Sequence, residues 1–276
     1  MSSSVQEGRV TKPHTRRRRV REIPKTRTTS QHHDRYAIEH DKKKKHHHQL
    51  PLVERTNERS IQEFASKYIP KECLVYQARG VAGSDPEGSE QQKEYRLSVY
   101  DPSTIPDTDL NQCFKLIEET SSDAYRDSST GWSPTKKRKE MKLPDMKYLV
   151  VRREGGSEDD EEEGGDDVVG FMSFMITYED GKEVVYCYEV HLSPSVQGQG
   201  LGKRLMLMLL EIGRRVGMEK AMLTVFRSNA VAQRLYAALG FETDEYSPRP
   251  RRLRNGTVKE PDYRIMSIRL DGGPYV

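Results

Sequence analysis

A glycine-rich turn between a predicted strand and a predicted helix has a composition suited to binding an anion. The hexapeptide QGQGLG at 197–202 follows a strand that ends near Leu192 and precedes a helix that starts near Gly200. Such a turn exposes backbone N–H groups at the positive end of a helix dipole, where a pyrophosphate group can bind. The spacing Q-x-x-G-x-G differs from the G-x-G-x-x-G of dinucleotide folds and from a P-loop. From the hexapeptide alone, an ordinary glycine turn without a ligand remains an alternative interpretation.

A carboxylate inside an apolar strand is the second chemical candidate. Glu189 lies in the segment VVYCYEVHL at 184–192. Because burying an unpaired carboxylate is costly, we expect Glu189 to be half-buried with a raised pKa, as suits a general base. Alternatively, Glu189 lies on a solvent-exposed face of the strand, or it forms a structural ion pair with Lys or Arg. Strict alternation puts Tyr188 and Glu189 on opposite faces unless a β-bulge intervenes.

A short helix downstream completes a pattern that resembles a known superfamily. Asn229 opens this helix after the strand 220–226, and Ala232, Tyr236 and Gly240 follow at regular spacing. Taken with Q-x-x-G-x-G, this order resembles the GNAT superfamily of N-acetyltransferases over about 147–270. The resemblance implies a mixed α/β (α+β) GNAT fold, a central mixed sheet flanked by helices. It also implies loop amides that bind the pyrophosphate of acetyl-CoA, between two strands that splay apart.

Five segments are similar to a narrower family within that superfamily. These segments are DAYRDSSTGW (123–132), VVYCYEVHL (184–192), GLGKRLM (200–206), MLTVFRSN (222–229) and the ending SPxP…DYRI (247–265). They resemble the histone-specific N-terminal acetyltransferase D (NatD) family. The resemblance implies acetyl transfer from acetyl-CoA to the N-terminal serine amine of histone H4 and histone 2A tails, which begin Ser-Gly-Arg-Gly. Thr130 stands where that family has an additional Trp, and Thr177 stands where it has an acid.

The resemblance implies roles for the residues that match family motifs. Glu189, acting directly or through a water, and Tyr188 are the catalytic candidates. The implied cofactor-binding residues are Val190, His191, Leu192, Gln197, Gly198, Gln199, Gly200, Leu201, Gly202, Lys203 and Asn229. The implied substrate-binding residues are Tyr125, Trp132, Tyr188, Thr224, Ser247 and Tyr263. Tyr236 holds the usual position of a general acid, with packing as an equal alternative, and no metal is implied.

The spacing of apolar residues predicts the helices and strands that must position these residues. Helices are predicted over 52–69, after Asp107, after the Ser133-Pro134 start signal, and over 200–217 and 229–240. Strands are predicted over 95–101, 147–152, 168–178, 184–192, 220–226, 241–246 and 261–270. An antiparallel front half followed by strand–helix–strand–helix–strand predicts the same mixed α/β domain. We expect it to occupy 51–276.

Composition separates that domain from two charged segments. Residues 1–50 hold 14 Lys+Arg against 5 Asp+Glu, so we expect a disordered basic tail that acts in nuclear import or weak nucleic-acid contact. An acidic insert at about 154–167 is expected to be a disordered hairpin loop. No apolar run approaches the ~18 residues of a membrane span, and the N-terminus has no secretory pattern. We therefore expect a soluble monomer without membrane contact, in the nucleus and cytoplasm.

Other interpretations of the same residues remain. A lysine acetyltransferase of the GNAT fold would act on an amine of pKa about 10.4, which is harder to deprotonate and needs a stronger general base. A catalytically silent chromatin-binding GNAT module would use the basic tail on DNA and the acidic insert on histones. The intact glycine turn together with Glu189 argues against the silent module. For the substrate's Arg, the acidic candidates are Glu183, Asp244 and Glu245.

Overall fold

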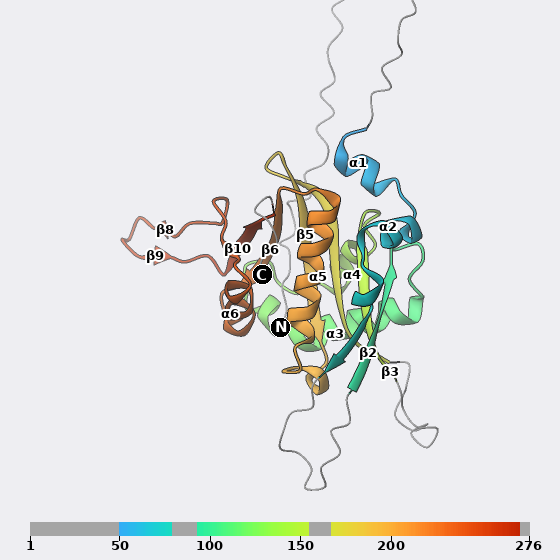
Figure 1. Cartoon of the computed structure of the whole chain (residues 1–276). Coiled ribbons are helices and arrows are strands. Elements are labelled where there is room, and N and C mark those ends of the chain that lie inside the picture. Colours follow the sequence, from blue (N-terminus) through green and yellow to red (C-terminus); the bar gives the residue numbers. More distant parts are fainter. Residues whose placement is uncertain (1–49, 79–92, 155–166, 271–276) are drawn as a thin grey trace, which may run out of the picture.

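A single eight-stranded sheet organises the chain, with helices on both of its faces (Figure 1). The computed structural model describes residues 50–78, 93–154 and 167–270. The strand order is β1-β2-β3-β4-β5-β6-β10-β7. The strands are β1 Val75–Ala78, β2 Lys93–Tyr100, β3 Lys147–Glu154, β4 Val168–Glu179, β5 Lys182–Leu192, β6 Lys220–Phe226, β7 Glu242–Thr243 and β10 Tyr263–Arg269. The predicted mixed α/β class is confirmed.

Six α-helices within the described residues cover the sheet. They are α1 Leu52–Asn57, α2 Ile61–Tyr68, α3 Asp107–Arg126, α4 Pro134–Met141, α5 Leu201–Val216 and α6 Ala230–Ala238. Two buried clusters, one on each face, hold these helices in place. Helices α1, α2, α5 and α6 contribute to one cluster, and α3 and α4 contribute to the other. The sheet therefore lies between two apolar layers, as its continuous apolar strands require.

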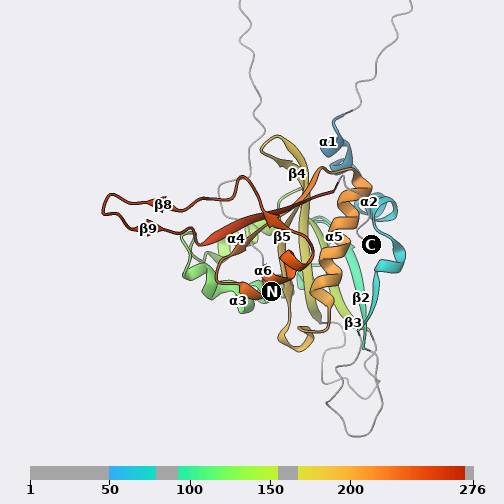
Figure 2. The same ribbon diagram turned by 60° about the vertical axis from the view of Figure 1, so that its left-hand side comes forward.

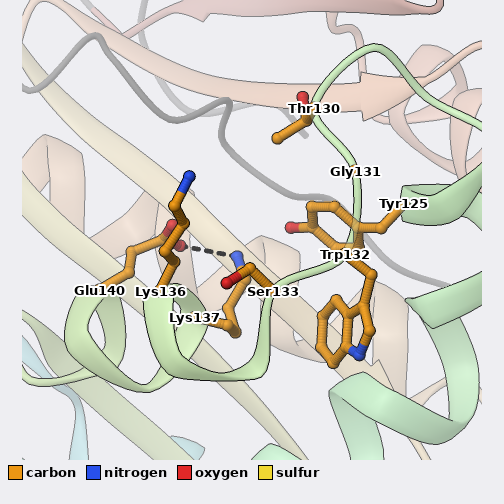
Figure 3. Close-up of a pocket in the computed structure, with 8 residues that line it drawn as sticks. All are labelled: Tyr125, Thr130, Gly131, Trp132, Ser133, Lys136, Lys137 and Glu140. Atoms are coloured by element: carbon orange, nitrogen blue, oxygen red, sulfur yellow. Dashed lines mark hydrogen bonds and ion pairs between the residues drawn. The ribbon is translucent and has the colours of Figure 1, made fainter.

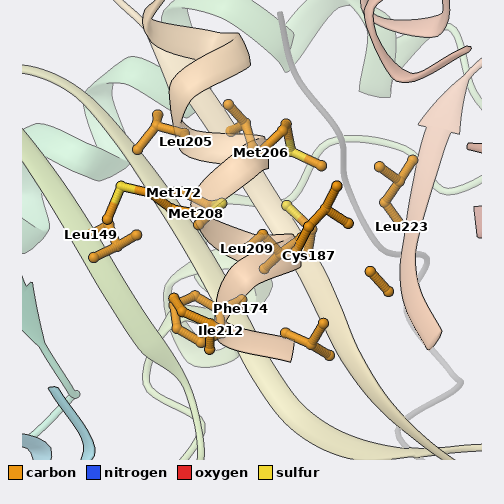
Figure 4. Packing of buried hydrophobic residues seen from close by; sticks show 14 of the residues in the cluster. Leu149, Met172, Phe174, Cys187, Leu205, Met206, Met208, Leu209, Ile212 and Leu223 are labelled. Atoms are coloured by element: carbon orange, nitrogen blue, oxygen red, sulfur yellow. The ribbon is translucent and has the colours of Figure 1, made fainter. Parts of the chain in front are cut away.

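Helix α5 carries the largest apolar stripe of the first layer (Figure 4). Leu205, Leu209 and Ile212 recur at the spacing of one helix face and are fully buried. They pack over the central strands, where Phe174 and Cys187 are fully buried too. Gly217, in the left-handed region at φ 96°, ends the helix as its position in the sequence predicts. This packing fixes the start of α5, and with it the glycine turn.

The predicted helix over 52–69 is wrong in one respect, because the chain forms two helices there. Ser60 interrupts it and caps α2: its hydroxyl accepts the N–H of Glu63, and the Glu63 carboxylate accepts the N–H of Ser60. This reciprocal pair is a capping box, whose S-x-x-E spacing is visible in the sequence. The predicted start of α4 is confirmed, with Ser133 at the N-cap and Pro134 as the first helical residue, although the Ser133 side chain makes no capping hydrogen bond there.

The C-terminal segment holds the other corrections. The strand predicted over 241–246 is reduced to two residues in β7. Two short strands were not predicted, β8 Arg251–Arg252 and β9 Val258–Lys259, which pair only with each other. They form a hairpin that projects from the body in both views (Figures 1 and 2). The basic tail 1–50 and the acidic insert 154–167 lie outside the described residues, apart from Leu50, Glu154 and Asp167.

Candidate active site

The central strands β5 and β6 separate partway along their length. Their parallel pairing runs from Val184 opposite Lys220 to Cys187 opposite Leu223 and then stops. β5 continues to Leu192 and stays paired with β4 on its other side. Among the described strands, the edge of β5 from Tyr188 to Leu192 therefore has no partner on the β6 side. An extended ligand can pair with such an edge, as the predicted role of Val190, His191 and Leu192 requires.

A β-bulge at Tyr188 decides which side chains meet at this fork. In the pairing of β4 with β5, Ser173 lies opposite Glu189 and Phe174 lies opposite Cys187, so Tyr188 has no partner. One extra residue exchanges the two faces of the strand beyond it. As a result Tyr188 and Glu189 both face the layer of α3 and α4. The bulge that would bring the two catalytic candidates together is therefore present.

Glu189 is the centre of a buried polar network. Its carboxylate is 1% exposed. Lys137 of α4 donates to Oε1 at 2.8 Å, and His191 Nε2 lies 2.6 Å from Oε2. Tyr125 of α3 donates a longer bond of 3.4 Å to Oε1. Both carboxylate oxygens are therefore engaged, which is what permits a charge at this depth.

The network extends from Glu189 in two directions. Lys137 also donates to Glu140 at 2.8 Å, so one ammonium group bridges two carboxylates. On the other side, His191 Nδ1 lies 2.6 Å from the hydroxyl of Thr120 on α3. Lys137 and Thr120 were not singled out from the sequence. Lys137 lies in a run of basic residues that is typical of a solvent-exposed helix face. Only the packing of α4 shows that its side chain points inward.

Electrostatics fix the protonation state of the pair, and they correct the expected pKa of Glu189. Burial alone would raise the pKa of Glu189, but Lys137 and His191 together hold it below its ordinary value. Burial alone would lower the pKa of Lys137, and the nearby Glu189 raises it well above that of a free lysine. Burial lowers the pKa of His191. At neutral pH Glu189 and Lys137 are charged and His191 is neutral. The expected half-buried carboxylate of raised pKa is therefore wrong, and the pairing with a lysine that was the alternative is present.

The glycine turn presents uncapped backbone donors at the start of α5. Within the described residues, no acceptor is hydrogen-bonded to the backbone N–H groups of 198–203. Gly200 is the N-terminal boundary residue, and no side chain caps the helix there. Gly198 and Gly200 both have positive φ, 77° and 83°. The donors and the helix dipole therefore suit a pyrophosphate, as the sequence indicates.

Two tyrosines hold the turn in this shape, and neither was predicted from the sequence. Tyr76 of β1 donates to the carbonyl of Gln199 at 2.8 Å. Tyr95 of β2 donates to the Gln199 side-chain oxygen at 2.6 Å. A Cβ on Gly200 would lie 2.6 Å from the Tyr76 hydroxyl. Gly200 is thus required both by its φ and by the closeness of Tyr76, while the side chain of Gln199 serves the loop itself.

A small aromatic pocket opens beside the buried network (Figure 3). Its lining joins Tyr125 and Trp132 with Lys137 and Glu140, and Thr130 forms part of its rim. The rings of Tyr125 and Trp132 lie 5.4 Å apart, and Trp132 stacks on Phe114 at 6.0 Å. Two of the predicted substrate-binding residues are therefore adjacent, and they lie within reach of Glu189 through Tyr125 and Lys137.

The remaining predicted residues lie in defined environments, and Ile265 links two of them, because it pairs with Thr224 and donates to Ser247. Thr224 is hydrogen-bonded to the Tyr186 hydroxyl at 2.7 Å, and Ser247 accepts the N–H of Ile265 at 3.1 Å. Asn229 caps α6 by accepting the N–H of Ala232 at 3.0 Å. These contacts show what each side chain does in the fold, and their roles toward a ligand stay predictions.

Three further predictions concern Tyr236, Tyr263 and the acids for a substrate arginine. Tyr236 is fully buried against Phe241 at 6.0 Å between ring centroids, and Tyr263 is half-buried on β10. Asp244 is buried and receives a bond from Lys220 at 3.1 Å, and Glu245 lies 3.6 Å from the same lysine. Those two acids are therefore already partnered within the chain.

Neither a metal centre nor a membrane span is found in the described residues. No group of three or more His, Cys, Asp or Glu side chains there could hold a metal ion. No helix of that part is both long and apolar enough to cross a bilayer.

Comparison with known proteins places the fork inside a recognised domain. Residues 114–241 match the sequence profile of the acetyltransferase (GNAT) family. The match runs from α3 to the end of α6, which is less than half of the chain, and it includes β5 and the glycine turn. Acetyltransferases of this family use acetyl-CoA as the acetyl donor, for which the uncapped turn and the open edge of β5 are suited.

Two curated relatives match shorter stretches. N-alpha-acetyltransferase 40 of Saccharomyces cerevisiae is 39% identical over 98 residues, which are 29% of this chain and 34% of that protein. Mycothiol acetyltransferase of Saccharomonospora viridis is 45% identical over 65 residues, 24% of this chain and 21% of that protein. The chain thus spans about a third or less of the length of these relatives. The structure of Arabidopsis thaliana NAA60 with a bisubstrate analogue is 13% identical with a TM-score of 0.43, covering 64% of this chain and 99% of that one.

Proposed function

We propose that this protein is an N-alpha-acetyltransferase that moves an acetyl group from acetyl-CoA to the N-terminal amine of a protein. One observation carries the proposal: the uncapped donors of the glycine turn and the bulge that turns Glu189 toward α3 and α4 lie at the two ends of the same open β5 edge. The GNAT profile match and the yeast relative's name support it. A pyrophosphate on the turn and a thioester near Glu189 would be joined by an extended arm along β5.

Each part of the chain then has a chemical task. The backbone donors of 198–203 would hydrogen-bond the pyrophosphate, and the β5 edge would orient the pantetheine arm of acetyl-CoA. Acetyl-CoA would supply the acetyl group: the C–N bond to the amine forms as the thioester C–S bond breaks, and CoA leaves as the thiol. Glu189, held ionised by Lys137, accepts the proton that the attacking amine loses, directly or through a water. Tyr188, brought to the same face by the bulge, is the second catalytic candidate.

The charge state of Glu189 favours an α-amine over a lysine side chain. A carboxylate of lowered pKa is a weak base, so it suits an amine that is already partly deprotonated at neutral pH. An α-amine has a pKa of about 7.7–8.0, whereas the lysine ε-amine has a pKa of about 10.4. The proton is therefore removed at lower cost from a protein N-terminus.

The finer part of the proposal concerns the substrate. We propose the N-terminal serine of histone H4 and histone 2A, bound by Tyr125, Trp132, Tyr188, Thr224, Ser247 and Tyr263. The resemblance to the NatD family supports this choice, and the yeast relative's name supports acetylation of an α-amine. The pocket between Tyr125 and Trp132 is small, which favours a small first residue. A histone substrate and the basic tail together support a location in the nucleus and cytoplasm.

A peptide panel tests both the reaction and the substrate. A peptide starting Ser-Gly-Arg-Gly is expected to gain one acetyl group on its α-amine, because that amine is the more easily deprotonated one. The same peptide with a blocked N-terminus and free lysines is expected to stay unmodified. Mass spectrometry after incubation with acetyl-CoA gives the site. Equal activity on the blocked peptide would replace the proposal with lysine acetylation, and replacing the third residue by Glu measures the need for Arg.

The cofactor site has its own test in two matched glycine variants. Gly200→Ala and Gly198→Ala each place a side chain at positive φ, at a cost of about 1–2 kcal/mol. Only the Cβ at Gly200 meets the Tyr76 hydroxyl, whereas the space around Gly198 is open. Gly200→Ala is therefore expected to lose acetyl-CoA affinity in calorimetric titration, and adding Tyr76→Phe should restore part of it. Unchanged affinity in a folded Gly200→Ala protein would place the cofactor elsewhere.

A further inference from the structure

The projecting hairpin formed by β8 and β9 carries a set of unpaired positive charges. Five basic side chains between Ser247 and Asp262 are fully on the surface, and none has an ion-pair partner within the described residues. These five are Arg249, Arg251, Arg252, Arg254 and Lys259. The predicted active site does not use any of them.

The two acidic residues of the segment, Glu260 and Asp262, connect it to the body of the domain. Glu260 pairs with Arg227 at 3.1 Å. Asp262 accepts the backbone N–H of Ser129, and its own carbonyl accepts the N–H of Arg227 at 2.8 Å. The base of the hairpin is therefore neutralised and fixed, while its outer part keeps an uncompensated positive charge.

The pairing within the hairpin is unfavourable unless an anion is nearby. Arg251 lies directly opposite Lys259, and Arg252 lies opposite Val258. Like charges directly opposite each other destabilise an antiparallel pair, and an isolated two-stranded hairpin is marginally stable in water. Bonds at the tip nevertheless define its shape, since Leu253 donates to the Thr257 carbonyl at 2.8 Å and Gly256 donates to the Leu253 carbonyl at 3.0 Å. A bound polyanion would remove the repulsion.

We propose that this hairpin binds the phosphate backbone of duplex nucleic acid. Directly opposite residues share a face, so Arg251 and Lys259 lie on one face of the ribbon and Arg252 on the other. A groove of a duplex offers phosphates on both sides of an inserted two-stranded ribbon, and the major groove is wide enough for one. An acidic peptide lying on one face would leave Arg252 without a partner. The projection of the hairpin from the body leaves it accessible (Figure 2).

The cations continue from the ribbon to its base. Arg249, Arg251 and Lys259 line an open pocket of about 560 Å³ together with Ser128 and Ser129. Three acids also line it: Glu260 and Asp262, which anchor the hairpin, and the exposed Asp127. This pocket also borders Tyr263, one of the predicted substrate-binding residues. Nucleic acid held here would lie beside the mouth of the acetylation site. A basic protein tail that is itself bound to nucleic acid would thus be presented to the enzyme.

The test compares two variants of the full chain that lose the same charge. The hairpin variant is Arg251→Gln with Arg252→Gln and Lys259→Gln. The control variant is Lys71→Gln with Lys115→Gln and Lys142→Gln, which are exposed lysines outside the hairpin. Fluorescence anisotropy measures binding to a labelled 20-base-pair DNA, to an RNA duplex of the same sequence and to a labelled poly-glutamate peptide, over a range of salt concentrations.

The salt dependence gives the decisive result. Each lost phosphate contact lowers the slope of log K against log salt by about 0.9, so the hairpin variant should lose about 2 to 3 units of slope and several-fold in affinity. The control variant should keep the wild-type slope. The DNA and RNA arms show which duplex is preferred. Equal affinity and slope in both variants would overturn the proposal, as would loss of poly-glutamate binding with duplex binding unchanged. Circular dichroism and acetylation of a short free peptide should be normal in both variants.

Discussion

Replacing Glu189 by Gln is expected to lower kcat by about 10²–10⁴-fold, the usual effect of losing a general base. The amide keeps the shape of the side chain and leaves Lys137 paired with Glu140 at 2.8 Å, so the fold should persist. Glu140→Gln is the matched control, because it removes the other carboxylate on the same ammonium group. Its kcat should fall far less than that of Glu189→Gln. Similar rates in the two variants would show that the network supports structure only.

The pH profile of the wild-type enzyme follows from the same electrostatics. The pKa of Glu189 is below its ordinary value, so the carboxylate is ionised throughout the working range and does not limit the rate on the acid side. The acid limb of kcat/KM should instead follow the substrate α-amine, whose pKa is about 7.7–8.0. In Glu189→Gln the deficit should shrink as pH rises and more free amine is present. A wild-type inflection near pH 6 would indicate a raised carboxyl pKa and contradict this assignment.

Most of the fold could be predicted because its central elements have strong apolar periods. Helix α5 and strands β4 and β5 are apolar over long runs and are bounded by glycine or turn residues. The glycine turn could also be predicted, because its glycines are visible in the sequence. Its proposed function depends on backbone N–H groups, which do not require any particular side chain. The short strands β1, β7, β8 and β9 contain two to four residues and have too little pattern to be found or correctly bounded in this way.

The parts of the site that depend on packing could not be predicted. Lys137 belongs to a helix of low apolar content, and its burial follows from how α4 lies on the sheet. Tyr76 and Tyr95 reach Gln199 from more than a hundred residues away in the chain. The raised pKa expected for Glu189 failed for the same reason, because it assumed a carboxylate without a cation. A buried Glu in an apolar strand is itself a signal that a cation must be found nearby.

Replacing Lys137 by Met is expected to lower the free energy of unfolding by about 3–5 kcal/mol, the usual cost of leaving one member of a buried ion pair uncompensated. Lys137 is 5% exposed and Glu189 is 1% exposed, so water cannot replace the lost contact. Urea denaturation at pH 7 measures the change. The stabilisation from the lowered pKa of Glu189 is present above its unfolded value of about 4.3 and is lost as pH falls through the folded value. The gap between the two proteins should therefore narrow in acid.

The double variant Lys137→Met with Glu189→Gln separates this pair from the rest of the network. Removing both charges leaves a methionine beside an amide that His191 and Tyr125 can still contact, so the double variant should be more stable than Lys137→Met alone. Such a result requires a favourable coupling between the two residues, which additive effects at independent sites would not give. If the two single losses simply add, Lys137 interacts mainly with Glu140, and the ionised state of Glu189 depends on His191 instead.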